Sequence, residues 1–271
     1  KKVENITLED TLLGDDSRPR KISKLIRGRG PLYKIVSIND FEYIVNENHI
    51  LVLKVYTNTY MSREGKNLYG YVNDDGIIRE VNLDNNHDYE NYNNILLPIG
   101  SIVEISVSDY MKLLRNTNKR ISSILYEYRT ACLTKGYNIL HEYDSVANDF
   151  IFNQKEIPFK YFNNNYFVRL SLLITIIKIN NNNTFTIKNK NLMNQLKELA
   201  GSLGYMYLYY YTDSTKITLL KPNHKNDSYI SPFIINLFAE GEYYGFSINK
   251  NKRYIMDDFI VTHNSNGKSV Y

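Results

Sequence analysis

Short runs of β-branched and aromatic residues alternate with clusters of Asn, Asp and Gly along the first hundred residues. Runs of this kind, bounded by turn-forming residues, are typical of β-strands. Turn residues gather at 14–16 (Gly-Asp-Asp) and at 73–76 (Asn-Asp-Asp-Gly). We therefore expect strands within 33–38, 41–46, 49–56, 68–73 and 100–108.

The pattern changes at Ser108, where apolar residues begin to recur at helical spacing. Positions 111, 114, 121, 124 and 125 are apolar, which favours a helix through 109–133. A second helix is predicted over 189–204, with apolar residues at 192, 193, 196, 199 and 203 and Gly204 as a C-terminal stop. Between them, 167–179 is a buried apolar segment that periodicity alone assigns to neither helix nor strand.

Strand-like sequence returns near Ser231 and recurs at 233–238, 243–248 and 253–262. The order β, mixed α/β, β is what a domain inserted into a loop of an all-β host produces. We therefore expect a mainly β host made of 1–107 and 230–264, and an inserted α+β domain at 108–229.

The composition narrows the class of protein. A chain of 271 residues can bury a sizeable core in one or two domains. The net charge of +4 does not by itself indicate a nucleic-acid partner. The longest apolar run, 170–177, falls far short of the ~20 residues that span a membrane. A single cysteine, Cys132, excludes an internal disulfide framework, so we expect a cytoplasmic, reducing location without membrane contact.

His263, Asn264 and Ser265 carry the clearest chemistry in the sequence. The side-chain amide of an asparagine can attack its own backbone carbonyl, which closes a succinimide ring and cuts the chain after that residue. Nucleophile and target share one residue, so positioning supplies much of the barrier reduction. A neighbouring histidine can protonate the leaving amine or polarise the carbonyl, and the next hydroxyl can accept an acyl group. By itself the tripeptide also arises by chance.

Three segments around this tripeptide resemble the intein family of protein-splicing elements. Residues 243–265 (YYGFSINKNKRYIMDDFIVTHNS) are similar to the C-terminal blocks of the family. Residues 8–35 (LEDTLLGDDSRPRKISKLIRGRGPLYKI) are similar to the stretch after its first block, and 43–54 (YIVNENHILVLK) to the block whose histidine activates the upstream scissile peptide. The resemblance implies the mainly β horseshoe of the Hint (hedgehog/intein) fold, and autocatalytic protein splicing as the function.

The resemblance implies roles for three residues away from the C-terminal junction. His49 would protonate or distort the peptide at the upstream splice junction. Asn46 stands where many inteins have Thr and would hydrogen-bond that junction. Asp258 matches the acidic position that assists transfer between the two ends.

At the downstream junction, the resemblance implies that His263 and Asn264 perform the cyclisation. Ser265 would accept the acyl group as the first residue of the downstream extein. Residues 265–271 contain Asn-Gly-Lys-Ser, half of a phosphate-binding loop, with Thr262 where the first glycine of such a loop would stand. We therefore expect the flanking exteins, which are the substrate, to belong to a P-loop NTPase such as a viral-type helicase.

One departure from the family lies at the start of the sequence. Inteins begin with a Cys or Ser nucleophile in a short block ahead of such a segment, whereas this sequence opens with Lys1 and Lys2. Cys132 lies in the inserted region and cannot replace that nucleophile. Either a separate short N-terminal fragment carries the Cys or Ser, as in a split intein that splices in trans, or the block has been trimmed. Alone, this chain is not expected to splice.

The inserted region resembles the LAGLIDADG homing endonucleases that many inteins carry. Residues 168–187 are similar to the motif helix of that family, and 189–205 to the helix that follows it. Lys178 stands at the metal-binding Asp of the motif, Asn180 at its second Asp and Thr175 at its close-packing Gly. Because a lysine cannot bind Mg²⁺, we expect a degenerate endonuclease with no metal, no cofactor and no cleavage activity.

Two other functions stay open. The first is a DNA-binding or homing-endonuclease protein whose β segments are only a scaffold, because Lys178 argues against cleavage and not against binding. However, the basic residues between 18 and 29, Arg20 among them, lack interleaved aromatics and are expected to line a solvated β edge, so DNA binding is not expected. The second is a β domain whose terminal His-Asn is accidental. Loss of 265–271 with a succinimide at Asn264 would support splicing alone.

Overall fold

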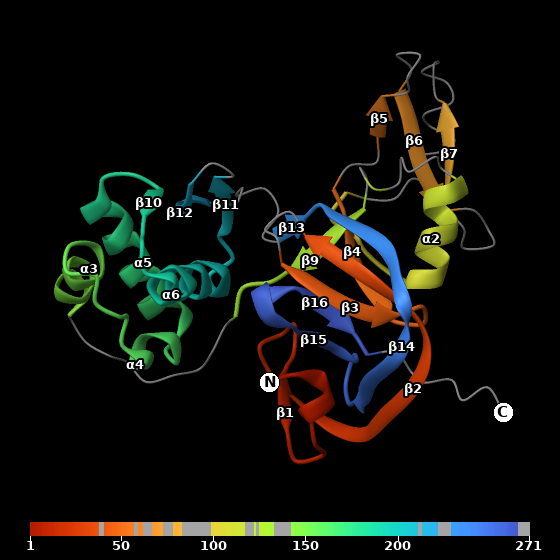
Figure 1. Ribbon diagram of the computed structural model, residues 1–271. Coiled ribbons are helices and arrows are strands. Elements are labelled where there is room, and N and C mark those ends of the chain that lie inside the picture. Colours follow the sequence, from red (N-terminus) through yellow and green to blue (C-terminus); the bar gives the residue numbers. More distant parts are fainter. Residues whose placement is uncertain are drawn as a thin grey trace.

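The computed structural model describes residues 1–37, 41–56, 99–116, 122, 125–132, 142–210, 213–221 and 229–264, with the backbone of three strands between 59 and 82. These residues form a mainly β body and a separate lobe rich in helix (Figure 1). Within these ranges, no helix combines the length and apolar character needed to cross a membrane.

A long antiparallel ribbon forms one half of the β body. Strand β2 (Pro19–Ser37) pairs with β14 (Phe233–Ile248) along almost its whole length, and β14 bulges between Leu237 and Ala239. Strands β1 (Thr11–Leu13) and β3 (Glu42–Asn46) pair with opposite ends of β2. In Figure 1 the ribbon curves around the other strands of the body, as expected where a bulge increases the local twist.

The second sheet has the strand order β13-β9-β4-β16-β15, and β8 also pairs with β4. Its strands are β4 (Ile50–Val55), β8 (Ile102–Ser106), β9 (Leu125–Arg129), β13 (Tyr229–Ser231), β15 (Arg253–Ile255) and β16 (Val261–His263). This order places β16, from the far end of the described chain, directly beside β4. The short 3₁₀ turn η3 (Asp257–Phe259) connects β15 to β16.

Apolar side chains from both sheets and from helix α2 (Val107–Asn116) fill the core of the β body. Ile35 of β2, Leu53 of β4 and Leu125 of β9 are almost completely buried in it. Tyr110 of α2 stacks on Phe233 of β14, with their ring centroids 5.3 Å apart. Burial on this scale is the main force that holds the two sheets together.

The helix-rich lobe has a core of its own. It contains α3 (Tyr143–Ile151), α4 (Phe159–Phe162), α5 (Tyr166–Asn180) and α6 (Lys190–Ser202), with an antiparallel sheet of β10 (Thr184–Thr186), β11 (Met206–Tyr210) and β12 (Asp213–Leu220). Leu172, Ile176 and Leu196 are completely buried in this core. Figure 1 shows the lobe set apart from the β body, with α6 and β11 on the side that faces it.

Two smaller elements complete the described fold. Strands β5 (Thr59–Met61), β6 (Asn67–Val72) and β7 (Ile78–Asn82) form an antiparallel sheet that extends from the β body in Figure 1. A short 3₁₀ turn, η1 (Val3–Asn5), precedes β1.

The packed units differ from the division expected from sequence. The range 108–229 contains β9 and all but the first residue of α2, yet both elements belong to the β body, because Tyr110 and Leu125 are buried in its core. The lobe with its own core covers 142–220 instead. The helix expected through 109–133 is wrong at Leu125–Arg129, which forms a strand. Its backbone pairs with β4 and β13, and its alternate side chains are buried on one face of the sheet.

Other sequence expectations are confirmed. The helix predicted over 189–204 is α6, and Gly204 follows it with a positive φ of 83°. The undecided segment 167–179 is helical and lies within α5, which begins where the Asn165 side chain accepts a hydrogen bond from the Val168 N–H at 3.0 Å. The two strand runs near 233 and 243 form one strand, β14.

The expectation that Arg20 lies on a solvated β edge is wrong, because this residue is buried. Its guanidinium contacts Asp16 at 2.8 Å and Asp15 at 2.9 Å, and its Nε donates to the Arg253 carbonyl at 3.1 Å. A buried guanidinium needs such partners, because an unpaired charge in the interior is strongly unfavourable. Arg20 therefore ties the start of β2 to β15.

Candidate active site

Pairing of β16 with β4 brings the two predicted histidines together. Thr262 lies opposite Leu51 and His263 opposite Ile50 in this pair. His49, which directly precedes β4, places its Nε2 atom 2.6 Å from Thr262 Oγ1, across 213 residues of sequence. His263 is also near enough to His49 to lower its pKa, so the histidine of the upstream block and the one beside Asn264 lie close together.

The position of His49 is fixed by its backbone. Its N–H donates to the Asn46 carbonyl at 3.2 Å, and its own carbonyl accepts from the Val107 N–H at 2.9 Å. Burial, together with a smaller effect of the nearby His263, lowers the pKa of His49 from 6.5 to about 4. At neutral pH the imidazole of His49 is therefore uncharged.

His263 lies near an acidic side chain of β8, the strand on the other side of β4. Its Nε2 atom lies 4.0 Å from Oε2 of Glu104, and the other oxygen of this carboxylate, Oε1, accepts a 2.6 Å hydrogen bond from Arg253 Nε. Burial lowers the pKa of His263, although the Glu104 carboxylate opposes this effect. A neutral imidazole at this position can accept or donate a proton close to the next residue, Asn264.

Asn264 is buried at the end of β16. Its backbone N–H donates to the Lys252 carbonyl at 2.9 Å. Its side-chain nitrogen, Nδ2, has no hydrogen-bond partner among the residues that the structure describes. A buried amide normally finds partners, because leaving one unpaired costs about 1–3 kcal/mol. The unpaired nitrogen is the atom that would attack the carbonyl carbon of Asn264.

Asp258 is also buried, but its carboxylate points to other partners. Arg129 of β9 donates to one carboxylate oxygen, and the Tyr207 hydroxyl of β11 donates to the other. Within the described ranges, no hydrogen bond or ion pair joins Asp258 to His49, His263 or Asn264. Asp258 therefore lies beside the helix-rich lobe, and its hydrogen bonds tie it to Arg129 and Tyr207.

The two remaining predicted residues have less defined surroundings. Asn46 ends β3 and accepts the His49 N–H with its backbone carbonyl, while its side chain forms no hydrogen bond with another described residue. Ser265 and the rest of 265–271 lie outside the described residues, so the acceptor and the host segment have no structural description.

A second buried carboxylate lies close to Asp258. Glu127 of β9 accepts hydrogen bonds from the Ser37 hydroxyl and, at 2.7 Å, from the Tyr43 hydroxyl. Burial raises the pKa of Glu127 from 4.5 to about 7, against the opposing effect of these hydroxyls and of Arg129. Glu127 therefore changes its charge near neutral pH inside the β body.

Sequence reasoning did not single out Thr262, Glu104 or Tyr207 as site residues. Thr262 stands next to His263, but nothing in its spacing shows that its hydroxyl meets His49. Glu104 lies in the mostly apolar strand β8, and a charged residue in such a run is a sequence signal that could mark it as a site residue. Tyr207 is one of 25 tyrosines in the chain, and no sequence pattern distinguishes it.

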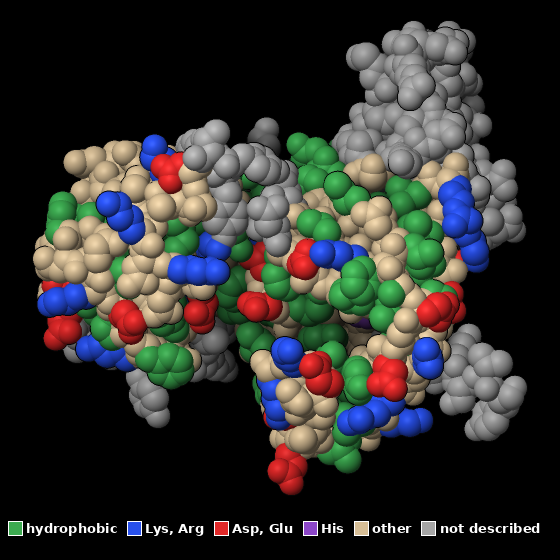
Figure 2. Space-filling view, viewed as in Figure 1, with side chains coloured by type: hydrophobic (Ala, Val, Ile, Leu, Met, Phe, Trp, Pro, Cys, Tyr) green, Lys and Arg blue, Asp and Glu red, His purple; other side chains and the backbone are tan. Residues whose placement is uncertain are grey.

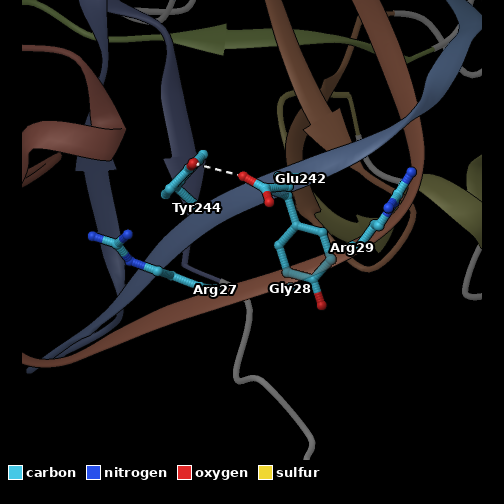
Figure 3. Close-up of a pocket in the computed structure, with 6 residues that line it drawn as sticks. Arg27, Gly28, Arg29, Glu242 and Tyr244 are labelled. Atoms are coloured by element: carbon cyan, nitrogen blue, oxygen red, sulfur yellow. Dashed lines mark hydrogen bonds between the residues drawn. The ribbon is translucent and has the colours of Figure 1, made fainter.

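The pocket drawn in Figure 3 shares no residue with this site. It is a hollow of about 400 Å³ on the β2–β14 ribbon, lined by Arg27, Gly28, Arg29, Glu242, Tyr243 and Tyr244. Tyr244 donates to Glu242 at 3.0 Å, while Arg27 and Arg29 extend away from each other. Because its polar groups do not converge, we assign it no chemistry.

The described residues on the face of the molecule shown in Figure 2 form no surface feature that indicates a binding site. Figure 2 shows Lys and Arg interspersed with Asp and Glu over both parts of the molecule, and histidine contributes only a sliver of visible surface. Among the described residues, no group of three or more His, Cys, Asp or Glu could hold a metal ion. Lys178, at the position that resembles a metal-binding Asp, is exposed on α5.

The comparisons with known proteins leave the family of this chain open. No protein-family profile matches the chain, and no curated protein matches it significantly.

Proposed function

We propose that the protein is an intein-like splicing element of the Hint type, which cuts its own chain after Asn264. The observation that carries the proposal is the buried Nδ2 of Asn264, which has no hydrogen-bond partner among the described residues. Asn264 follows His263 of β16, and β16 pairs with β4, which His49 directly precedes. The curved β2–β14 ribbon and the β4–β16 pair are consistent with a fold that brings two distant chain segments to one site.

The cleavage step follows from these positions. Nδ2 of Asn264 attacks the carbonyl carbon of the same residue and forms the succinimide ring, while the peptide bond to Ser265 breaks. A proton leaves Nδ2 and a proton is gained by the departing amine of Ser265. His263, held neutral by burial, is the group beside Asn264 that can transfer a proton in this step. The hydrogen bond from the Asn264 N–H to Lys252 keeps the reacting residue in place.

Complete splicing requires a second nucleophile upstream of this segment. In the proposal, a Cys or Ser in a short N-terminal fragment, on a separate chain or directly preceding Lys1, forms an ester or thioester. Ser265 then accepts the acyl group, with Asp258 assisting transfer, before Asn264 cyclises. His49 would act on the upstream peptide from its place beside Thr262. The substrate is the pair of flanking exteins, and 265–271 would rejoin a P-loop host.

Release of residues 265–271 from the full chain tests the cleavage step. Purified protein is incubated near neutral pH and its mass is followed with time. We expect a slow appearance of the heptapeptide and of a chain that ends in a succinimide at Asn264. Asn264→Ala should abolish the release, because no amide remains to attack. The exposed Asn163 supplies the control variant Asn163→Ala, which should cleave normally. Equal release from both variants would disprove the proposed function.

A further inference from the structure

The helix-rich lobe reaches into the β body at the turn before β16. The Tyr207 hydroxyl of β11 and the Arg129 guanidinium of β9 each donate to one oxygen of Asp258. All three side chains are buried, with exposed fractions of 6%, 3% and 8% for Tyr207, Arg129 and Asp258. Asp258 is therefore held between the two parts of the protein by charge-assisted hydrogen bonds, which are the stronger kind.

A close packing contact lies beside this hydrogen bond. The ring of Phe259 rests on α6 at Gly201, where an added Cβ atom would come within 2.6 Å of the Phe259 Cδ2 atom. The Phe259 carbonyl also accepts from the Thr130 N–H at 3.2 Å. A glycine at this position lets the ring approach the helix backbone, and any larger residue would push the ring away.

The backbone held by these contacts is strained. Asp258 and Phe259 both have positive φ angles, 58° and 60°, in the left-handed region that non-glycine residues avoid. Such conformations persist where the surroundings hold them in place. The contacts with Tyr207 and Gly201 come from the lobe, so the lobe supplies part of that support.

From these observations we propose that the helix-rich lobe positions the reacting strand. Tyr207 and Gly201 hold η3, and η3 leads into β16, which ends at His263 and directly precedes Asn264. Tyr207 is thus a positioning residue that acts through Asp258. This inference rests on the proposed function for its effect on rate, but its structural part can be measured independently.

The first experiment compares two tyrosine variants of the full chain. Tyr207→Phe removes the hydroxyl that binds Asp258. Tyr205→Phe is the matched control, since Tyr205 is buried in the core of the same lobe and its hydroxyl bonds to no described residue. We expect Tyr207→Phe to slow heptapeptide release about tenfold and Tyr205→Phe to change it less than about twofold, as loss of one charge-assisted hydrogen bond predicts.

A double-mutant cycle shows whether Tyr207 acts through Asp258. In an Asp258→Asn background, Tyr207→Phe should have little further effect, because its partner has already been altered. A general loss of stability would instead slow cleavage by the same factor in both backgrounds. Gly201→Ala displaces η3 by a different route and should also slow cleavage. Equal rates for Tyr207→Phe and Tyr205→Phe, with both variants folded by circular dichroism, would overturn the inference.

Amide hydrogen exchange separates this inference from the proposed function. Exchange in the segment 257–263 is measured by mass spectrometry for the wild type and both tyrosine variants. Tyr207→Phe should accelerate exchange there, while Tyr205→Phe should not. If the wild type releases no heptapeptide, the proposed function fails, yet exchange still decides whether the lobe holds the strand. Unchanged exchange in Tyr207→Phe would refute the positioning role.

Discussion

The buried carboxyl of Glu127 should make the stability of the protein fall as the pH rises. In the unfolded chain this carboxyl ionises above its usual pKa of 4.5, whereas in the folded state it keeps its proton until about pH 7. Between these values the folded state binds more protons, so the free energy of unfolding decreases with increasing pH. At about 1.4 kcal/mol per pKa unit, the full loss is about 3 kcal/mol.

Glu127→Gln removes the charge and leaves a side chain of the same shape that can still accept from Tyr43 or Ser37. The free energy of unfolding is measured by urea titration at about pH 5 and about pH 8, and the change between the two is compared among variants. Between the two pH values, the free energy of unfolding of the wild type should fall by about 2–3 kcal/mol more than that of Glu127→Gln. The control is Glu42→Gln, because Glu42 is exposed at the start of β3. The same pH dependence in wild type and Glu127→Gln would refute the reasoning.

Two further predictions concern the histidines and Arg20. When an N-terminal segment with its Cys or Ser is supplied, His49→Ala should suppress thiol-induced release of the upstream extein, and His263→Ala should instead stall with a branched ester at Ser265, each by about 10²–10⁴ in rate. Identical gel time courses for the two variants would contradict this division of roles. Arg20→Leu should lower the free energy of unfolding by about 1.5–3 kcal/mol, because Asp15 loses its buried partner but keeps its contacts with Asn251 and Arg253. Urea titration checks this value, and a loss no greater than that of the exposed Arg18→Leu would contradict it.

Regular elements with a one-sided apolar pattern could be predicted from sequence. The helix α6 was predicted because its apolar residues recur at helical spacing, and Gly204 marks its end through a positive φ. Segment 167–179 could not be decided, since α5 is apolar on nearly all sides and its environment is set by the lobe. Strand β9 was misread because its alternation is short and its two neighbours in the sheet come from distant segments.

The sequence suggests candidate residues for the site but not the contacts that they form. Resemblance to the intein family pointed to His49 and Asn264, but the hydrogen bond between His49 and Thr262 spans 213 residues and depends on sheet register. The same holds for Tyr207, whose approach to Asp258 requires the lobe to dock on η3. Local patterns carry no information on such pairs, because tertiary packing alone brings them together.

The positions of β4 and β16 in the sequence determine when, during synthesis, the candidate site can first form. Strand β4 emerges early during synthesis and β16 late, with 213 residues between His49 and Thr262. At about 5–20 residues per second, the ribosome needs about 10–40 s to make the intervening chain. Until β16 emerges, β4 lacks the neighbour that brings Asn264 to the site, while the helix-rich lobe has already been synthesised. If Asn264 cleaves the chain as proposed, translation itself delays the reaction, because β16 joins β4 only after the rest of the described fold has been synthesised.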